Sequence, residues 1–140
     1  MPVLPIENIY TEKEEQEEYI RASHELYWLE LFDRIKSLEK LFSFRNVTAI
    51  IRFLDKHPFL IDLLQEAYTA IEQSFGPGPQ IELEIVADPE VPGLVEMFGY
   101  IITGLTPEEA GERLQQFDRK WFLKQLPRVK GLLNFDMEFV

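Results

Sequence analysis

Residues 75–85 read Phe75-Gly76-Pro77-Gly78-Pro79-Gln80-Ile81-Glu82-Leu83-Glu84-Ile85, and the spacing of the apolar residues changes within them. Two glycines and two prolines cannot continue a helix, so a helix that arrives from the N-terminal side must end here. After them, isoleucine and leucine alternate with glutamate, which is the two-residue period of a strand with one buried face. The stretch therefore predicts a helical part before it, over residues 1–75, and a strand-containing part after it, over residues 80–140.

Three helices are predicted before this boundary. The first, over about residues 11–42, opens with a capping box and carries apolar residues at alternating spacings of three and four. The second is capped by Asn46 and runs to about Lys56. The third has Pro58 at its first position and ends at Gly76, and it should form a compact pair with the second. Basic residues gather toward the C-terminal end of the first helix, where the helix dipole favours them: Arg34, Lys36, Lys40 and Arg45.

The part after the boundary is predicted to contain a strand, a second strand, a helix and a third strand. The second strand runs from Leu94 to Thr103, the helix opens at Thr106, and the third strand covers residues 133–139. A crossover helix leaves the second and third strands pointing the same way, and the first strand placed between them makes every neighbouring pair antiparallel. The helix should cover the apolar face of the sheet with Ala110, Leu114, Phe117 and Trp121.

The predicted fold is therefore a single α+β domain over residues 1–140. One long helix and a helix pair come first, followed by a strand-strand-helix-strand unit. Its sheet is predicted to be three-stranded and antiparallel, in the order 2-1-3.

The composition limits the kinds of function that the chain can have. The 140 residues carry a net charge of −11 and include no cysteine, which excludes disulfides, thiolate nucleophiles and cysteine-ligated metals. The acidic balance argues against nucleic acid and anionic membranes as partners. The N-terminus, Met1-Pro2-Val3-Leu4-Pro5, lacks the basic region and long apolar core of a signal sequence, so a cytoplasmic protein is expected. No motif indicates a cofactor or a small-molecule ligand.

Acidic residues are expected to gather on one face of the predicted sheet. Glu82 and Glu84 alternate on the first strand, Asp136 and Glu138 alternate on the last, and Glu96 is a further candidate. The simplest interpretation is a solvated polar face, which is common in antiparallel sheets. The alternatives are a site for a hard metal ion, which a hydrolase would use, and a patch that faces a partner protein.

Apolar residues of the first helix and of the second strand are candidates for a protein interface. The apolar stripe of the helix is wider than one contact requires, although core packing is the simpler interpretation. On the strand, two aromatic residues point away from the core if Met97 and Ile101 point into it, whereas the opposite register would bury them. The candidate interface residues are Trp28, Leu29, Phe32, Phe98 and Tyr100.

Five short segments carry a pattern that spans about residues 53–139. They are His57-Pro58-Phe59-Leu60, Glu84-Ile85-Val86-Ala87-Asp88-Pro89-Glu90, Leu105-Thr106-Pro107-Glu108-Glu109-Ala110, Phe117-Asp118 with Trp121, and Asn134-Phe135-Asp136-Met137-Glu138-Phe139. Together they resemble a family of small uncharacterised prokaryotic proteins. The resemblance implies a soluble prokaryotic protein, and it carries over neither an activity nor a catalytic residue.

These observations favour a non-enzymatic protein-binding or regulatory protein. We expect it to associate with itself, as a homodimer, or with a partner protein, through the first helix or through a sheet edge. Neutralisation of a basic partner, in the manner of an antitoxin, is one version. The alternative is a metal-dependent hydrolase that uses Glu82, Glu84, Asp136 and Glu138.

Overall fold

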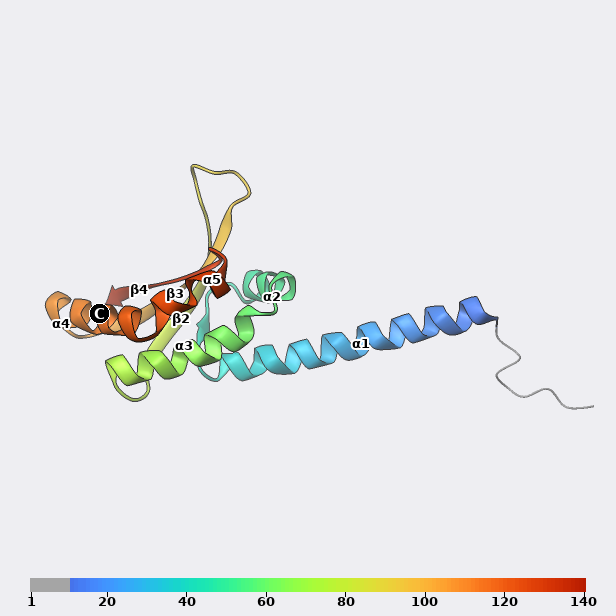
Figure 1. Cartoon of the computed structure of the whole chain (residues 1–140), viewed down its shortest axis with the longest axis horizontal. Helices are drawn as coiled ribbons and strands as arrows, with labels where there is room; N and C mark the ends of the chain where they lie inside the picture. The colour runs from blue at the N-terminus through green and yellow to red at the C-terminus, as the bar shows by residue number, and fades with distance from the viewer. Residues whose placement is uncertain (1–10) are drawn as a thin grey trace, which may run out of the picture. The chain divides into compact units, whose positions relative to one another are not determined.

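The computed structural model describes residues 11–140, and the α+β class that the sequence predicts is confirmed. The N-terminal residues on which the predicted absence of a signal sequence rests lie outside this range. The chain divides into two units, one ending at Asp33 and the other beginning at Arg34. The longest helix, α1 (Glu12–Glu39), begins in the first unit and ends in the second (Figure 1).

Helix α1 begins where the sequence predicts and ends earlier. The capping box forms, because the backbone N–H of Thr11 donates to Glu14 Oε2 at 3.1 Å and the backbone N–H of Glu14 donates to Thr11 Oγ1 at 3.2 Å. The helix ends at Glu39 rather than near residue 42, and the N–H groups of Leu41 and Phe42 close a final turn onto the carbonyl of Leu38. Lys40 and Arg45 therefore lie beyond the last residue of the helix.

The second unit contains the remaining elements. Its helical segments are α2 (Val47–Lys56), α3 (Leu60–Phe75), α4 (Pro107–Phe117), the π-helical turn η2 (Asp118–Phe122) and α5 (Leu123–Val129). Its strands are β1 (Ser43–Phe44), β2 (Gln80–Ala87), β3 (Val95–Thr103) and β4 (Leu133–Phe139). Asn46 caps α2 as predicted, with its side chain accepting from the Ala49 N–H at 3.2 Å. Pro58 precedes α3 in a turn instead of occupying its first position, and Gly76 ends that helix as predicted, with φ of 101°.

Within the described residues, four strands form one mixed sheet in the order β1-β2-β3-β4. β1 pairs with β2 in parallel, β2 with β3 antiparallel, and β3 with β4 in parallel. The predicted three-stranded antiparallel sheet in the order 2-1-3 is therefore wrong. β4 returns from its crossover helix to the strand that precedes the helix, and Gly99 of β3 leaves room beside it for Phe135. β1 was not predicted because two residues carry no periodicity.

One face of the sheet forms the core with the helices of the second unit. The burial alternates along the strands, so that the side chains on this face are almost fully inaccessible. They include Ile81, Leu83, Met97, Ile101, Leu133 and Phe135. The rings of Phe117 and Phe122 lie edge-on to that of Phe135, each with a centroid distance of 5.3 Å. These three rings attach the crossover helix to β4.

The π-helical turn changes which aromatic residue after α4 enters the core. Ala110 and Phe117 are fully buried, as the sequence predicts. After Phe117, however, Phe122 is buried and Trp121 is only partly covered. A π-turn holds more residues than an α-turn, so it rotates the following side chains out of the 3.6-residue pattern. The predicted core position of Trp121 is thus taken by its neighbour.

The position of Gly99 leads to a stability prediction. A β-carbon at this position would lie 2.7 Å from two ring atoms of Phe135, and that ring is held by Phe117 and Phe122. Gly99→Ala is therefore expected to lower the free energy of unfolding by about 1–3 kcal/mol, measured by urea denaturation. The matched control is Gly111→Ala in α4, where a β-carbon meets open space and is expected to be neutral or stabilising. Equal stability of the two variants would contradict the close approach.

Candidate functional site

Acidic side chains from two strands share the sheet face opposite the core. Glu82 and Glu84 come from β2, and Asp136 and Glu138 come from β4. Strand β3 lies between these strands, and its outward-facing residue Tyr100 is in register with Glu82 on one side and Asp136 on the other. We call these four carboxylates, together with Tyr100 between them, the acidic face.

Arg45 lies over the acidic face and binds three of its four carboxylates. Its Nε donates to Glu82 at 2.7 Å, and its Nη1 donates to Glu84 at 3.2 Å and to Glu138 at 3.0 Å. Its Nη2 donates to Glu82 and Glu138 as well. The guanidinium carbon lies 4.8 Å from the centre of the Tyr100 ring, within cation–π range. One side chain from the loop after β1 thus connects β2, β3 and β4.

Interactions within this cluster favour the charged forms of Arg45 and Glu138. The hydrogen bonds that Arg45 donates to Glu138 and Glu82 raise the pKa of its guanidinium above the ordinary value. In return, the hydrogen bond from Arg45 holds the pKa of the Glu138 carboxyl below its ordinary value. Burial raises the pKa of the Tyr100 phenol, so its ring stays neutral beneath the arginine. Three of the four carboxylates of the acidic face therefore belong to one ion-pair network around Arg45.

In the metal-ion interpretation, a metal ion would lie between these carboxylates. Arg45 occupies that position. The oxygens of Glu82, Glu84 and Glu138 already face the guanidinium, and a divalent ion would have to displace it. The fourth carboxylate, Asp136, is exposed and accepts from the N–H of Met137 at 2.8 Å. Within residues 11–140, no three histidine, aspartate or glutamate side chains are grouped so that they could hold a metal ion.

No direct signal in the sequence indicated that Arg45 contacts the acidic face. Arg45 follows β1, a strand too short to detect, and the arginine reaches the face only because its own N–H continues the pairing by donating to the Leu83 carbonyl at 2.8 Å. The available signal was indirect. Four carboxylates on one face repel each other strongly enough that a nearby cation is expected.

The two aromatic residues predicted for an interface on β3 are half-buried. Met97 and Ile101 point into the core, so Phe98 and Tyr100 do lie on the outer side. Their rings stack with a centroid distance of 5.7 Å and an interplanar angle of 13°. Tyr100 also contacts Arg45. The Phe98–Tyr100 pair is therefore already packed against other side chains of the same sheet face.

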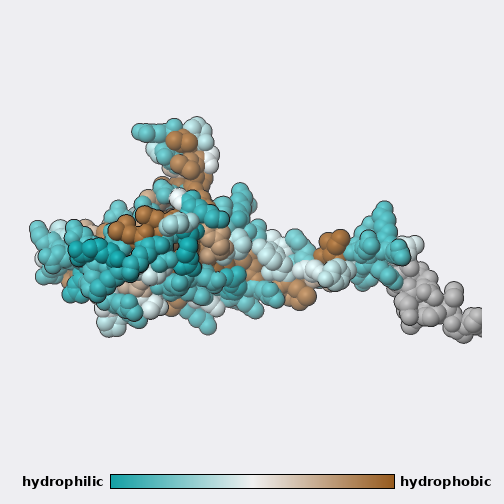
Figure 2. Space-filling view, in the orientation of Figure 1, coloured by the Kyte–Doolittle hydropathy of each residue, from teal (hydrophilic) through white to brown (hydrophobic). Residues whose placement is uncertain are grey.

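The exposed apolar side chains of α1 form a second candidate site, in the first unit. Between residues 19 and 32, seven large apolar side chains are at least 41% exposed. They are Tyr19, Ile20, Leu26, Tyr27, Trp28, Leu29 and Phe32, which include the three helix residues predicted for an interface. Brown side chains accordingly interrupt the teal surface of α1 in Figure 2. Single exposed apolar residues are ordinary, but a group of this size is typical of an interaction site.

Trp28 shows how this surface keeps its polar atoms satisfied. The indole Nε1 donates to His24 Nε2 at 2.8 Å, one helical turn away. The ring is also edge-on to Tyr27, with a centroid distance of 6.2 Å. Since the only polar atom of the indole is bonded within the helix, the ring presents apolar surface.

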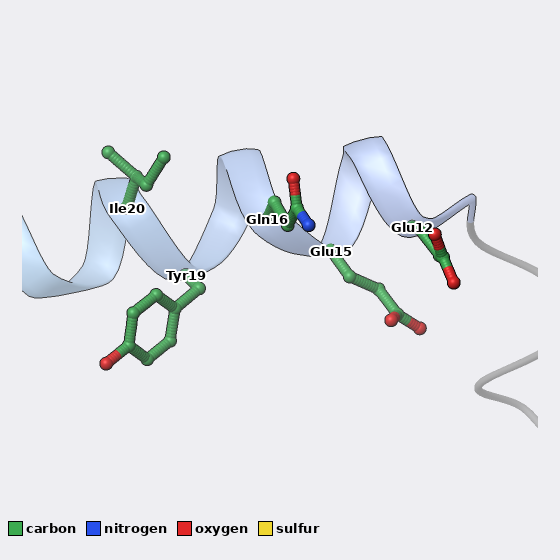
Figure 3. Close-up of a pocket in the computed structure, with 5 residues that line it drawn as sticks. All are labelled: Glu12, Glu15, Gln16, Tyr19 and Ile20. Atoms are coloured by element: carbon green, nitrogen blue, oxygen red, sulfur yellow. The ribbon is translucent and has the colours of Figure 1, made fainter.

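The hollows along α1 are surface features and not enclosed sites. Trp28, Leu29 and Phe32 line one together with Glu25. The other is lined by Glu12, Glu15, Gln16, Tyr19 and Ile20. In Figure 3 these five side chains all come from one helix and do not point toward a common centre. Nothing in either arrangement resembles a catalytic constellation.

A pocket of about 350 Å³ lies in the second unit between α2 and the β2–β3 hairpin. His57 lines it, beside apolar residues and the basic residues Arg52 and Lys56. The histidine ring lies 4.8 Å from that of Phe53, and its backbone N–H donates to the Phe53 carbonyl as the C-cap of α2. These contacts support the structural role at a helix junction that the position of His57 before Pro58 indicates.

The chain matches no family model, no curated protein and no solved structure. The resemblance of residues 53–139 to small prokaryotic proteins therefore stays a prediction. Among residues 11–140, no helix is both long enough and apolar enough to cross a lipid bilayer. The geometry of the candidate sites is therefore the basis for the proposed function.

Proposed function

We propose that this protein acts by binding protein and not by catalysis, with residues 19–32 of α1 as its binding surface. The observation that carries the proposal is the group of seven large apolar side chains on one helix, each at least 41% exposed. Burying one such side chain contributes about 1.5–3 kcal/mol. Because these side chains are already partly covered and association has its own cost, a partner must cover several of them to bind stably.

The distribution of these side chains around the helix supports the same proposal. Tyr19, Leu26 and Leu29 lie on one side of α1, whereas Tyr27 and Trp28 lie on others, at 100° per residue. A surface helix of a monomer has one apolar stripe, and a helix that is apolar all round is normally buried. The segment therefore has the composition of a helix inside an assembly.

The acidic face supports a structural role better than the alternative of a metal-dependent hydrolase. Three of the four carboxylates that this alternative needs are bonded to Arg45. The finer parts of the proposal are a regulatory role, exerted through the bound partner, and a cytoplasmic location. The latter is supported by the absence of cysteine, since the fold needs no oxidising compartment.

The test compares a glutamate placed on α1 with a glutamate that replaces an exposed leucine elsewhere. Leu29→Glu is expected to weaken association of the protein, with itself or with a captured partner, by about ten-fold or more. The control is Leu123→Glu in α5, where the leucine is 53% exposed and outside the proposed surface. Sedimentation and affinity capture measure the two kinds of association.

Two results together would refute the proposal. In the first, the purified wild-type chain does not self-associate up to about 100 μM, the range of weak specific complexes. In the second, the wild type and Leu29→Glu capture the same proteins in the same amounts.

A further inference from the structure

We infer that the partner of α1 is a second copy of this chain, bound antiparallel along a seam of four residues. The inference rests on the proposed function and names its partner. The seam consists of Tyr19, Ala22, Leu26 and Leu29, and all four are exposed.

The spacing of the seam is that of a coiled coil. Its members follow one another at intervals of three, four and three residues, which keeps them on one side of the helix over two heptads. The exposed fractions of Tyr19, Leu26 and Leu29 are 74%, 60% and 63%, so these are among the most exposed large apolar residues of α1. Strongly exposed apolar residues at heptad spacing are suited to a helical partner.

The seam is separate from the face that α1 uses in the second unit. There, Ile35 and Leu38 are buried in the core. At 100° per residue, these two residues project roughly opposite to Leu26 and Leu29. Since one side of the helix is already used by Ile35 and Leu38, the seam requires a covering of its own.

The seam is self-complementary when two copies run antiparallel. A two-fold axis between Ala22 and Leu26 places each alanine opposite the partner's leucine, and each Tyr19 opposite the partner's Leu29. Small residues then face large ones, which is how helices interdigitate without voids. A parallel pair would instead place alanine against alanine and leave a gap. Such a symmetric contact is the commonest kind of dimer interface.

The charges along α1 favour the same orientation. Residues 12–18 contain five glutamates and one lysine, a net charge of −4, whereas residues 30–36 contain two acidic and two basic residues and are neutral. A parallel pair would bring two segments of charge −4 side by side. The antiparallel pair sets each of them against the neutral segment, so like-charge repulsion is smaller.

The experiment uses the full chain, whose lack of cysteine allows single cysteines to report on neighbours. Tyr19→Cys and Leu29→Cys are prepared separately, with one of them carrying a mass tag, and are oxidised alone and as a mixture. The expected result is a mixed disulfide between positions 19 and 29, at least about ten-fold more abundant than either homodisulfide, because only facing cysteines meet the distance limits of a disulfide. Circular dichroism confirms that both variants retain their helices.

The outcomes separate the two orientations and the two proposals. Homodisulfides in excess of the mixed product would indicate a parallel pair, and a random distribution of the three products would indicate no fixed pairing; either result would overturn the inference. So would sedimentation of the wild type as a monomer at about 100 μM. In that case the proposed function still stands if Leu29→Glu loses a captured partner that Leu123→Glu retains. A dimer that persists in Leu29→Glu would place the contact elsewhere and overturn the inference.

Discussion

Replacing Phe117 with alanine is expected to lower the free energy of unfolding of the second unit by about 3–5 kcal/mol. Phe117 is fully buried. Its ring lies 5.9 Å from that of Phe122 and 5.3 Å from that of Phe135, measured between centroids. These neighbours are held by the crossover helix and by β4, so they cannot collapse fully into the space that the ring leaves. The cost is therefore both lost burial and a remaining cavity.

Urea denaturation of the purified chain measures this effect. Leu123→Ala is the control, because Leu123 is exposed on the helix that follows and its truncation is expected to cost less than about 1 kcal/mol. If Phe117→Ala does not fold, Phe117→Leu keeps the measurement possible, with an expected cost of about 1–2 kcal/mol. Equal costs for Phe117 and Leu123 would show that the aromatic cluster does not hold the second unit together.

Replacing Arg45 with methionine is expected to cost about 2 kcal/mol at neutral pH. The substitution keeps much of the apolar stem and removes the cation, which leaves Glu82, Glu84 and Glu138 facing one another. Breaking a fully buried ion pair costs about 3–5 kcal/mol, but the side chain of Arg45 is 31% exposed and solvent screens part of the effect. The control is Arg34→Met, which breaks one exposed pair with Asp62.

The pH dependence of the Arg45 variant follows from the lowered pKa of Glu138. A carboxyl whose folded-state pKa is lowered stabilises the fold above its unfolded pKa and loses this contribution as the pH falls through the folded value. The wild type therefore loses stability in acid. In Arg45→Met the same protonation relieves repulsion, so the difference between the two proteins should shrink between pH 7 and about pH 4. Urea midpoints at both pH values measure it, and a constant difference would contradict the role of charge.

Local signals in the sequence predicted the elements well, because each signal depends only on neighbouring residues. The capping box at Thr11, the N-cap Asn46 and the helix stop at Gly76 all form. Alternation with a period of two predicted β2 and β4, and the apolar run of residues 94–103 predicted β3. These features need no knowledge of what lies across the fold.

Features that depend on distant contacts could not be predicted in the same way. The order of the strands depends on how closely β4 approaches Gly99. The register after Phe117 depends on a π-turn, for which the sequence has no periodic signal. The position of Arg45 depends on a strand of two residues. The strand order and the position of Arg45 thus depend on contacts between segments far apart in the chain, whereas the π-turn is local but has no periodic signal.

The candidate sites show the same division. The alternation of acidic residues was sufficient to place four carboxylates on one sheet face, but not to find the arginine that binds three of them. For α1, the width of the apolar stripe indicated that Trp28, Leu29 and Phe32 exceed what core packing requires. Periodicity alone could not separate these residues from the core positions of the same stripe, Ile35 and Leu38.

The residues that form the cluster around Arg45 are synthesised at different times. The contact between Arg45 and Glu138 spans 93 positions in the chain, and β4 follows every other strand of the sheet. A ribosome therefore releases Arg45 and β3 before residues 133–139 have emerged. Until then β3 has an unpaired edge, and the aromatic cluster lacks Phe135. The nascent chain must keep the largely apolar strand β3 from pairing wrongly until its last partner emerges.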